Sequence, residues 1–275
     1  RRIYVPRGKL LGGSSSINGT AFVRGQSHDY DTWAQMGNRG WNYRDVLPFF
    51  KRMESYEGDG DNEFRGRDGP LRVTDPDWRD PLFATVIEAA GQVGIDHNPD
   101  YNGAKQDGIA MSQATIAGGR RMSTAHCYLT PARSRSNLNI VTEAMTEALL
   151  LDGKQCTGVR YRRGGVVHEA KAAREVVVSG GSINSPQLLE LSGIGQPELL
   201  GRHGIAVVHA LPGVGENLRD HFAPRTRWAI GAKGYTFNDR GRGLGLVGQV
   251  LRYLTSGRGM FGMVAAPLRA FVRSR

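Results

Sequence analysis

The run GKLLGGSSSIN, residues 8–18, combines residue types that suit a loop facing a ligand. The adjacent glycines Gly12 and Gly13 lack β-carbons, so the backbone there can come close to a flat molecule. The serines that follow can present hydroxyl groups and backbone amides at the same surface. Surface turns and linkers share this composition, so the loop by itself leaves a binding role and a plain turn both open.

The continuation of this loop and a second run farther along the chain favour a binding role over a plain turn. Residues 8–31, in which GTAFVRGQSHDYD follows the loop, resemble the first signature of the glucose-methanol-choline oxidoreductases. The run GSINSPQLLELSGIG, residues 181–195, is similar to the second signature of that family. An ordinary strand-to-helix connection would use the residues of the second run for the same backbone reasons. Two long motifs in the family's order favour the resemblance.

The resemblance is nearest to the choline dehydrogenase and alcohol dehydrogenase branch, and it implies FAD-dependent oxidation of the CH–OH group of an alcohol. In that family a base removes the hydroxyl proton and hydride passes to flavin N5, so the redox chemistry belongs to the flavin. The implied partners are a small alcohol, choline-like or another primary alcohol, and an electron acceptor, either oxygen or a quinone-like carrier.

The resemblance also implies which residues contact the cofactor. Carried over residue by residue, the flavin contacts are Leu11, Gly12, Gly13, Ser14, Asn18, Gly19, Thr20 and Ala21. Asn18 is the strongest candidate, because its amide both donates and accepts hydrogen bonds. Met145 matches a family position whose backbone meets the adenine. Some members tether flavin through a histidine where this chain has Ile17, which carries no nucleophile, so noncovalent FAD is expected.

The sequence assigns no catalytic residue and no metal ligand. The family's base is a histidine in a motif close to the carboxyl terminus, which we expect beyond residue 275. His221 follows Asp220, but adjacent side chains on an extended chain point apart, so we expect His221 to be structural. His203 and His209 lack the spacing of a metal-binding pair.

We expect the chain to be a central portion of such an enzyme. In the family, a strand-turn-helix with G-x-G-x-x-G upstream of the first signature seats the adenosine diphosphate group. We do not find that unit here: the glycine-rich run at 241–248 follows no convincing strand, so we do not expect it to serve as this turn. A portion without that turn and without the base is expected to be inactive alone. The alternative is a non-catalytic binding or scaffold fragment derived from such an enzyme.

The expected fold class is α/β with α+β character, a partial FAD/NAD(P)-binding-type flavoprotein fold that contains a β-meander. Residues 1–222 are expected to form the FAD-binding region without its dinucleotide-binding βαβ unit. Within it, residues 76–135 are expected to be an inserted part made mostly of helix and loop. Residues 223–275 are expected to begin a substrate-binding domain.

In the first half of the chain, capping residues and apolar spacing predict two helices. Asn42 can cap the first, and Pro48 is expected to kink or restart it. Asp80 can cap the second, with proline at its first position. The expected buried side of this second helix consists of Leu82, Val86, Ala89, Ala90 and Val93.

From residue 139 onward, short apolar segments between turns predict a meander of antiparallel strands. The expected elements are strands at 140–142, 148–151, 158–162, 166–171, 174–179 and 205–208, and helices at 184–191 and 197–203. The strand at 174–179 is a continuous apolar run, which suits burial on both faces. Two glycine-rich segments, residues 57–70 and 241–248, are expected to be loops, the former long and exposed.

The overall composition argues against several other classes of protein. The net charge is +10, but the arginines are scattered, so we expect a solvated basic surface and no nucleic-acid site. Cys127 and Cys156 form no CxxC pattern, which argues against a disulfide framework or a zinc site. No run approaches the roughly 18 apolar residues of a membrane span. We expect a cytoplasmic protein, with peripheral attachment to a membrane left open.

Overall fold

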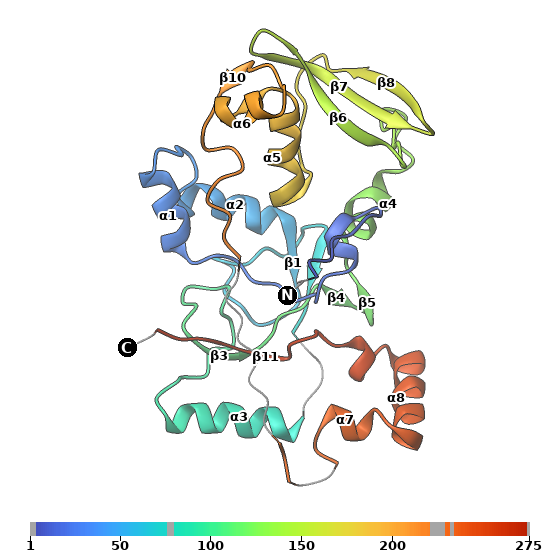
Figure 1. Cartoon of the computed structure of the whole chain (residues 1–275). Helices are drawn as coiled ribbons and strands as arrows, with labels where there is room; N and C mark the ends of the chain where they lie inside the picture. Colours follow the sequence, from blue (N-terminus) through green and yellow to red (C-terminus); the bar gives the residue numbers. More distant parts are fainter. Residues whose placement is uncertain (1–3, 76–79, 221–228, 232–233, 274–275) are drawn as a thin grey trace. The chain divides into compact units, whose positions relative to one another are not determined.

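The computed structural model describes residues 4–75, 80–220, 229–231 and 234–273. The chain divides into two compact units: unit 1 is Arg1–Leu138 with Trp228–Arg275, and unit 2 is Asn139–Arg227. Unit 1 therefore combines two stretches of sequence, and unit 2 is the stretch between them (Figure 1). Both units mix helices with short strands, as expected for the predicted fold class.

Unit 1 consists of short helices and three two-stranded sheets among its described residues. The sheets pair β1 (Glu54–Tyr56) with β2 (Leu71–Val73) in parallel, and β4 (Ile116–Ala117) with β5 (Arg120–Arg121) and β3 (Gly108–Met111) with β11 (Leu268–Phe271) antiparallel. In the last pair, Leu268 lies opposite Met111 and Phe271 opposite Gly108. This pairing joins the two stretches of unit 1, and both strands lie side by side in Figure 1.

The helical elements of unit 1 are η1 (Gly13–Ser16), α1 (Ser27–Gln35), α2 (Tyr43–Met53), α3 (Pro81–Gln92), η2 (Ala125–Leu129), α4 (Thr130–Ala132), α7 (Phe237–Arg240), α8 (Gly243–Ser256) and η3 (Met260–Gly262). A small apolar core lies where β1, β2, β4 and η2 meet. Its buried side chains are Phe22, Tyr56, Leu71, Val73, Ala117, Met122 and Cys127, with Met53 packed against them. Phe22 lies four residues after Asn18, the last residue of the glycine- and serine-rich run, so this core anchors the chain shortly after that run.

The cap of α2 is confirmed, whereas the expected interruption at Pro48 is wrong. Asn42 Oδ1 accepts a hydrogen bond from the Asp45 amide at 3.0 Å, as an N-cap should. The helix continues through Pro48, which cannot donate to the Arg44 carbonyl one turn earlier. Both residues are exposed, so water can hydrate that carbonyl and the lost hydrogen bond does not break the helix.

The start of α3 is confirmed, but its buried side differs from the expected one. Asp80 Oδ1 accepts from the Leu82 amide at 3.0 Å. Phe83 and Ala90 are the buried residues of the helix, while Val86 and Val93 are exposed. Phenylalanine at position 83 is the largest apolar side chain of this helix, and its burial rotates the contact face away from Val86. Of the expected set, only Ala90 is buried.

Residues 57–70 are irregular, as predicted, but the segment is not simply exposed. Arg65 is almost fully buried, and Gly66 is buried beside it. The Arg65 guanidinium pairs with the carboxylate of Glu54 at 2.8 Å. A charged side chain can be buried only with such partners, and the sequence of the segment does not reveal a partner that precedes it.

Unit 2 contains the predicted meander, made of β6 (Met145–Asp152), β7 (Gln155–Arg163) and β8 (Val166–Lys171) in antiparallel order. It also contains α5 (Gly181–Leu191) and α6 (Pro197–Arg202), which confirm the two predicted helices, although α5 begins earlier than expected. Two short strands on either side of α6, β9 (Ile194–Gly195) and β10 (His209–Ala210), pair in parallel.

Three expected strands of unit 2 are absent or displaced. Residues 140–142 and 174–179 form no strand in the structure, and the strand expected at 205–208 is replaced by β10 immediately after it. A strand needs a hydrogen-bonded neighbour, and no described strand pairs with 174–179. Val177 in that segment is 76% exposed, so its apolar character does not reflect burial among the described residues.

The expectation of a loop at 241–248 is wrong. Residues 243–248 form the first half of α8, which ends at Gly257 with φ +68°. Leucine and valine at every third or fourth position have helical spacing, and this spacing overrides the cost of the three glycines. The apolar side chains of α8 are largely exposed, Leu244 most of all at 90%.

Candidate functional site

The glycine- and serine-rich run forms a tight loop whose shape depends on its two adjacent glycines. Gly12 and Gly13 have φ angles of +87° and +52°, in the left-handed region that side chains disfavour. A β-carbon on Gly12 would also overlap Ser16 Oγ, whereas one on Gly13 would meet nothing within 4 Å. The backbone at Gly12 therefore packs against other parts of the protein, whereas the backbone at Gly13 faces open space.

The serine hydroxyls hold the loop together, so they do not all face a ligand as the composition suggested. Ser15 Oγ donates to the Gly12 carbonyl at 2.5 Å and accepts from the Thr124 amide at 3.0 Å. Ser16 Oγ donates to the Leu11 carbonyl at 2.9 Å, and Ser14 Oγ accepts from the amide of Gly8 at 3.2 Å. These bonds fix the loop against the segment that enters η2.

The end of the loop is pinned by a strained residue. Thr20 has a φ of +62°, which is uncommon for a residue with a β-branched side chain, and it is buried. Its carbonyl accepts hydrogen bonds from both the amide and the hydroxyl of Thr115, at 2.8 and 3.2 Å. Ala21 then forms an isolated bridge with Ala114. The segment between β3 and β4 thus holds residues 20–21 in place.

Beside this segment lies a cavity of about 410 Å³. Its lining includes Asn18, Gly19 and Thr20 of the loop, Arg121 of β5, and the rings of Tyr253 and Phe261. A β-carbon on Gly19 would meet only Ala265 Cβ at 3.5 Å, so the backbone here is bare and faces open space. Bare backbone next to aromatic rings and an amide donor suits a flat ring with polar edges.

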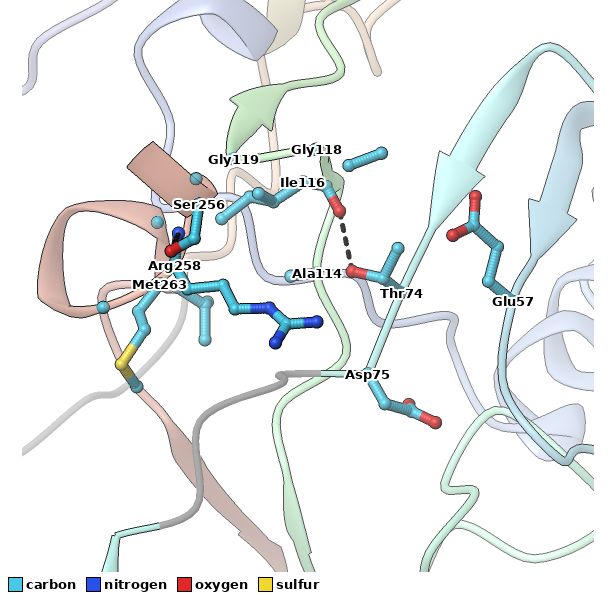
Figure 2. A pocket seen from close by; sticks show the side chains of 15 residues that line it. Glu57, Thr74, Asp75, Ala114, Ile116, Gly118, Gly119, Ser256, Arg258 and Met263 are labelled. Atoms are coloured by element: carbon cyan, nitrogen blue, oxygen red, sulfur yellow. Dashed lines mark hydrogen bonds between the residues drawn. The ribbon is translucent and has the colours of Figure 1, made fainter. Parts of the chain in front are cut away.

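A second cavity, of about 420 Å³, shares the wall residues Ile116, Gly119 and Met263 with the first. In Figure 2, Thr74 Oγ1 donates to the Ile116 carbonyl at 2.7 Å, which joins two residues of its wall. Asp75 lies on one side and Arg258 extends from the other side toward it. Because their walls are shared, a ligand in one cavity would lie next to a ligand in the other.

Unit 1 also contains a buried ionic cluster made of Arg24, Glu54, Arg65, Asp100 and Gln113. Arg65 donates to both carboxylate oxygens of Glu54, at 2.8 and 3.1 Å, and to Asp100 Oδ1 at 2.6 Å. Arg24 Nη2 lies 2.6 Å from Glu54 Oε1, so two arginines share one carboxylate. Arg65 also donates to Gln113 Oε1 at 3.0 Å.

This cluster fixes the chain just after the glycine-rich loop. Asn102 Oδ1 accepts from the backbone amide of Arg24 at 2.7 Å, and Asn102 Nδ2 donates to Gln113 Oε1 at 2.6 Å. Tyr101 donates its hydroxyl hydrogen to the Phe22 carbonyl at 3.0 Å. These residues could not be identified from the sequence, because their pairing depends on contacts between distant segments.

Burial perturbs several titratable groups around the cluster. It raises the pKa of the Tyr56 hydroxyl far above its ordinary value, with Asp75 and Asp100 adding to the effect. Burial also raises the pKa of the Asp75 carboxyl, which accepts from Tyr56 at 3.0 Å on both oxygens. For Arg65, burial is outweighed by Glu54, so its pKa is raised. Arg65 therefore stays charged in the interior.

The pKa of Arg24 moves the other way. Burial lowers it, and the attraction of Glu54 offsets this only in part. Arg65 itself adds to the lowering, because the two cations face the same carboxylate. The geometry also distinguishes the two arginines: Arg65 donates two hydrogen bonds to Glu54, whereas Arg24 Nη2 forms an ion pair with Glu54 Oε1 without a hydrogen bond.

Comparison with known proteins shows the family of the chain. The family description "GMC oxidoreductase" matches residues 1–223, most of the chain. The chain belongs to the GMC oxidoreductase family. The resemblance stated from the two signatures is thereby confirmed.

Curated relatives of this GMC chain include the oxygen-dependent choline dehydrogenases of Rhizobium etli (strain CIAT 652) and Brucella anthropi. The first is 50% identical over 221 residues, which are 80% of this chain and 40% of that protein. The second is 48% identical over 221 residues, with the same coverage of 80% and 40%. The chain thus spans about two fifths of the length of the curated relatives it matches.

Solved structures resemble the GMC chain over nearly all of its length. An FAD-dependent oxidoreductase from Chaetomium thermophilum has a TM-score of 0.84 and 27% identity, covering 94% of this chain and 48% of that one. A formate oxidase of Aspergillus oryzae, studied for FAD modification, has a TM-score of 0.84 and 28% identity, with 98% and 48% covered. These likenesses confirm the predicted fold class.

The predicted cofactor contacts fall into two groups. Leu11, Gly12, Gly13, Ser14, Asn18, Gly19, Thr20 and Ala21 form one continuous segment of unit 1, and three of them line the 410 Å³ cavity. Met145 and the second signature belong to unit 2, where Met145 begins β6 opposite Arg162 and is 63% exposed. The assignment of these residues to a cofactor stays a prediction, as does the domain division at residues 222 and 223.

Other expected features concern metals, cysteines and membranes. Among the described residues, no group of three or more His, Cys, Asp or Glu side chains is arranged to hold a metal ion. Cys127 and Cys156 are both free thiols. His221 lies outside the described residues. In the described part of the chain, every helix is too short or too polar to cross a bilayer.

Proposed function

We propose that this GMC chain supplies the flavin-facing part of an FAD-dependent oxidoreductase that oxidises the CH–OH group of a small alcohol. Relatives at about half identity are named oxygen-dependent choline dehydrogenase, which favours a choline-like or other primary alcohol and oxygen as acceptor. A quinone-like carrier is the other acceptor that the proposal allows. When bound, FAD would supply the electron-accepting ring, and the chain's residues would hold and orient it.

The observation that carries the proposal is the open backbone beside the 410 Å³ cavity. Gly19 and Asn18 both line this cavity, and a β-carbon on Gly19 would meet only Ala265 Cβ, at 3.5 Å. Gly13, earlier in the loop, also has open space where a β-carbon would lie. Leu11, Gly12, Ser14, Thr20 and Ala21 shape this surface through the bonds described above. Met145 is proposed to meet the adenine through its backbone. We propose that the catalytic base is a histidine beyond residue 275 and assign none to this chain.

We further propose that FAD is held without a covalent bond. Ile17, where some relatives of the family carry a tethering histidine, is 46% exposed and offers only hydrocarbon. Acid precipitation of the flavin-loaded protein tests this directly. All yellow colour should remain in the supernatant, and flavin that precipitates with the chain would contradict noncovalent binding.

The proposal is tested by the substitution Gly19→Leu. The 275-residue chain is purified and titrated with FAD, and binding is followed by quenching of flavin fluorescence. Gly19→Leu should abolish binding, because the new side chain enters the space proposed for the ring. Gly91→Ala in α3 is the control, since a β-carbon on Gly91 meets nothing within 4 Å and this position lies far from the loop in sequence.

Two results would count against the proposed function. A folded wild-type chain that melts cooperatively and ignores FAD would favour the binding or scaffold alternative. Binding that Gly19→Leu leaves unchanged would remove the 410 Å³ cavity as the flavin site. The thermal melting curve of each variant separates loss of binding from loss of folding.

A further inference from the structure

We infer that Arg121 is a positioning residue that turns the amide of Asn18 toward the 410 Å³ cavity, where the bound ring must present a hydrogen-bond acceptor. The inference rests on the proposed function, because the ring in question is that of FAD. It adds Arg121 of β5 to the residues that the first signature assigns to the site.

The first step is the orientation of Asn18. Its Oδ1 accepts from Arg121 Nη1 at 2.6 Å and from the Thr20 amide at 3.0 Å. Both partners can only donate, so the oxygen must face them and the amide cannot be flipped. In the part of the chain that the structure describes, Nδ2 makes no hydrogen bond, and its two hydrogens remain for a ligand.

The second step is the placement of Arg121. The β4–β5 hairpin turns through Gly118 and Gly119, whose φ angles are +56° and +73°, as a two-residue turn of the primed type requires. This register sets Arg121 opposite Ile116. Arg121 Nη1 also donates to the carbonyl of Ser15 at 3.3 Å, so one guanidinium contacts two residues of the loop. Its position is therefore fixed by backbone geometry.

The third step concerns the ligand. Two amide hydrogens and a guanidinium charge at one wall favour an electron-rich acceptor, such as a ring carbonyl or a phosphate oxygen. The rings of Tyr253 and Phe261, with centroids 6.1 Å apart, line the same cavity and favour a ring over a phosphate. The inference therefore commits to the polar edge of the isoalloxazine ring.

The experiment measures FAD dissociation constants for Asn18→Ala, Arg121→Ala and the double variant. Each single change should weaken binding about tenfold, the effect of one charge-assisted hydrogen bond. The double variant should bind about as weakly as Asn18→Ala, because Arg121 acts through Asn18. Arg121→Lys keeps a donor and should recover part of the loss. Arg120→Ala is the matched control, since Arg120 lines the same cavity without contacting Asn18.

Riboflavin and ADP separate the two acceptor chemistries. Riboflavin has the ring without phosphates, and its binding should fall in the same variants, whereas ADP binding should not change. Independent, additive losses in the double variant would overturn the inference, as would an effect of Arg120→Ala equal to that of Arg121→Ala. A loss confined to ADP would also overturn it. A folded wild-type chain that binds no FAD would overturn the proposed function, and the inference with it.

Discussion

The substitution Glu54→Gln tests whether the buried ionic cluster stabilises unit 1. The carboxylate is fully buried; it accepts from Arg65 twice and from the Gly66 amide at 2.9 Å, and it forms an ion pair with Arg24. Glutamine keeps one acceptor oxygen, but it turns an NH₂ group toward the guanidinium donors and removes the negative charge. Two arginines are then left facing each other in the interior.

The size of the effect follows from this loss of charge. Breaking a buried ion pair by removing one partner costs about 3–5 kcal/mol, a large share of the roughly 5–15 kcal/mol that stabilises a typical domain. A cost of about 4 kcal/mol raises the unfolded fraction by about three orders of magnitude. Urea denaturation followed by tryptophan fluorescence measures the change as a lower midpoint with an unchanged slope.

A matched control lies three residues away. Glu57 pairs with Arg72 at 2.5 Å, but both side chains are well exposed, so Glu57→Gln should cost less than about 1 kcal/mol. Replacing Arg24 with methionine in the Glu54→Gln background should recover part of the loss, because one uncompensated cation is removed. If Glu54→Gln shifts the midpoint no more than Glu57→Gln, the idea that burial makes this cluster strong is refuted.

Three further changes test local features of unit 1. Burial raises the pKa of the Tyr101 hydroxyl to about 12. The unfolded chain loses this proton at a lower pH, so the free energy of unfolding should fall between pH 10 and about 12. In melting curves recorded over this pH range, Tyr101→Phe should reduce the fall. Asn42→Ala removes the cap of α2 and should cost about 1 kcal/mol in urea denaturation; an unchanged midpoint would contradict the cap. Gly12→Ala should lower the melting temperature more than Gly13→Ala, because only Gly12 adds a clash with Ser16 to the strain of a positive φ; equal losses would contradict this.

The features that could be predicted from the sequence are those set by nearby residues. The caps Asn42 and Asp80 act on amides two or three positions away, so their side chains were sufficient evidence. The meander of unit 2 followed from short apolar segments between glycine turns, for the same local reason. The signature loop was found because its motif is long, and its backbone does adopt the left-handed angles that adjacent glycines allow.

The features that could not be predicted depend on contacts between residues far apart in sequence, or on opposing local preferences for helix and loop. Arg65 looked like one more charge in a polar loop, and its burial requires Glu54, Asp100 and Gln113 from three other segments. The glycines of α8 suggested a loop, although the leucine and valine spacing was helical. Arg121 offered no sign of its role, because its bond to Asn18 spans 103 positions of the sequence.

The pairing of β3 with β11 has a consequence for the order in which the protein assembles. Leu268 meets Met111 only after the whole of unit 2 has been synthesised, so unit 1 cannot close while the ribosome is still translating the intervening stretch. Unit 2 is continuous in sequence and can fold as soon as it emerges. Contacts between residues so far apart in sequence slow folding. Until β11 is made, β3 in residues 1–138 therefore lacks its partner strand. A nascent chain arrested after unit 2 has left the ribosome, but before β11 emerges, should therefore protect unit 2 from proteolysis and leave unit 1 open to it.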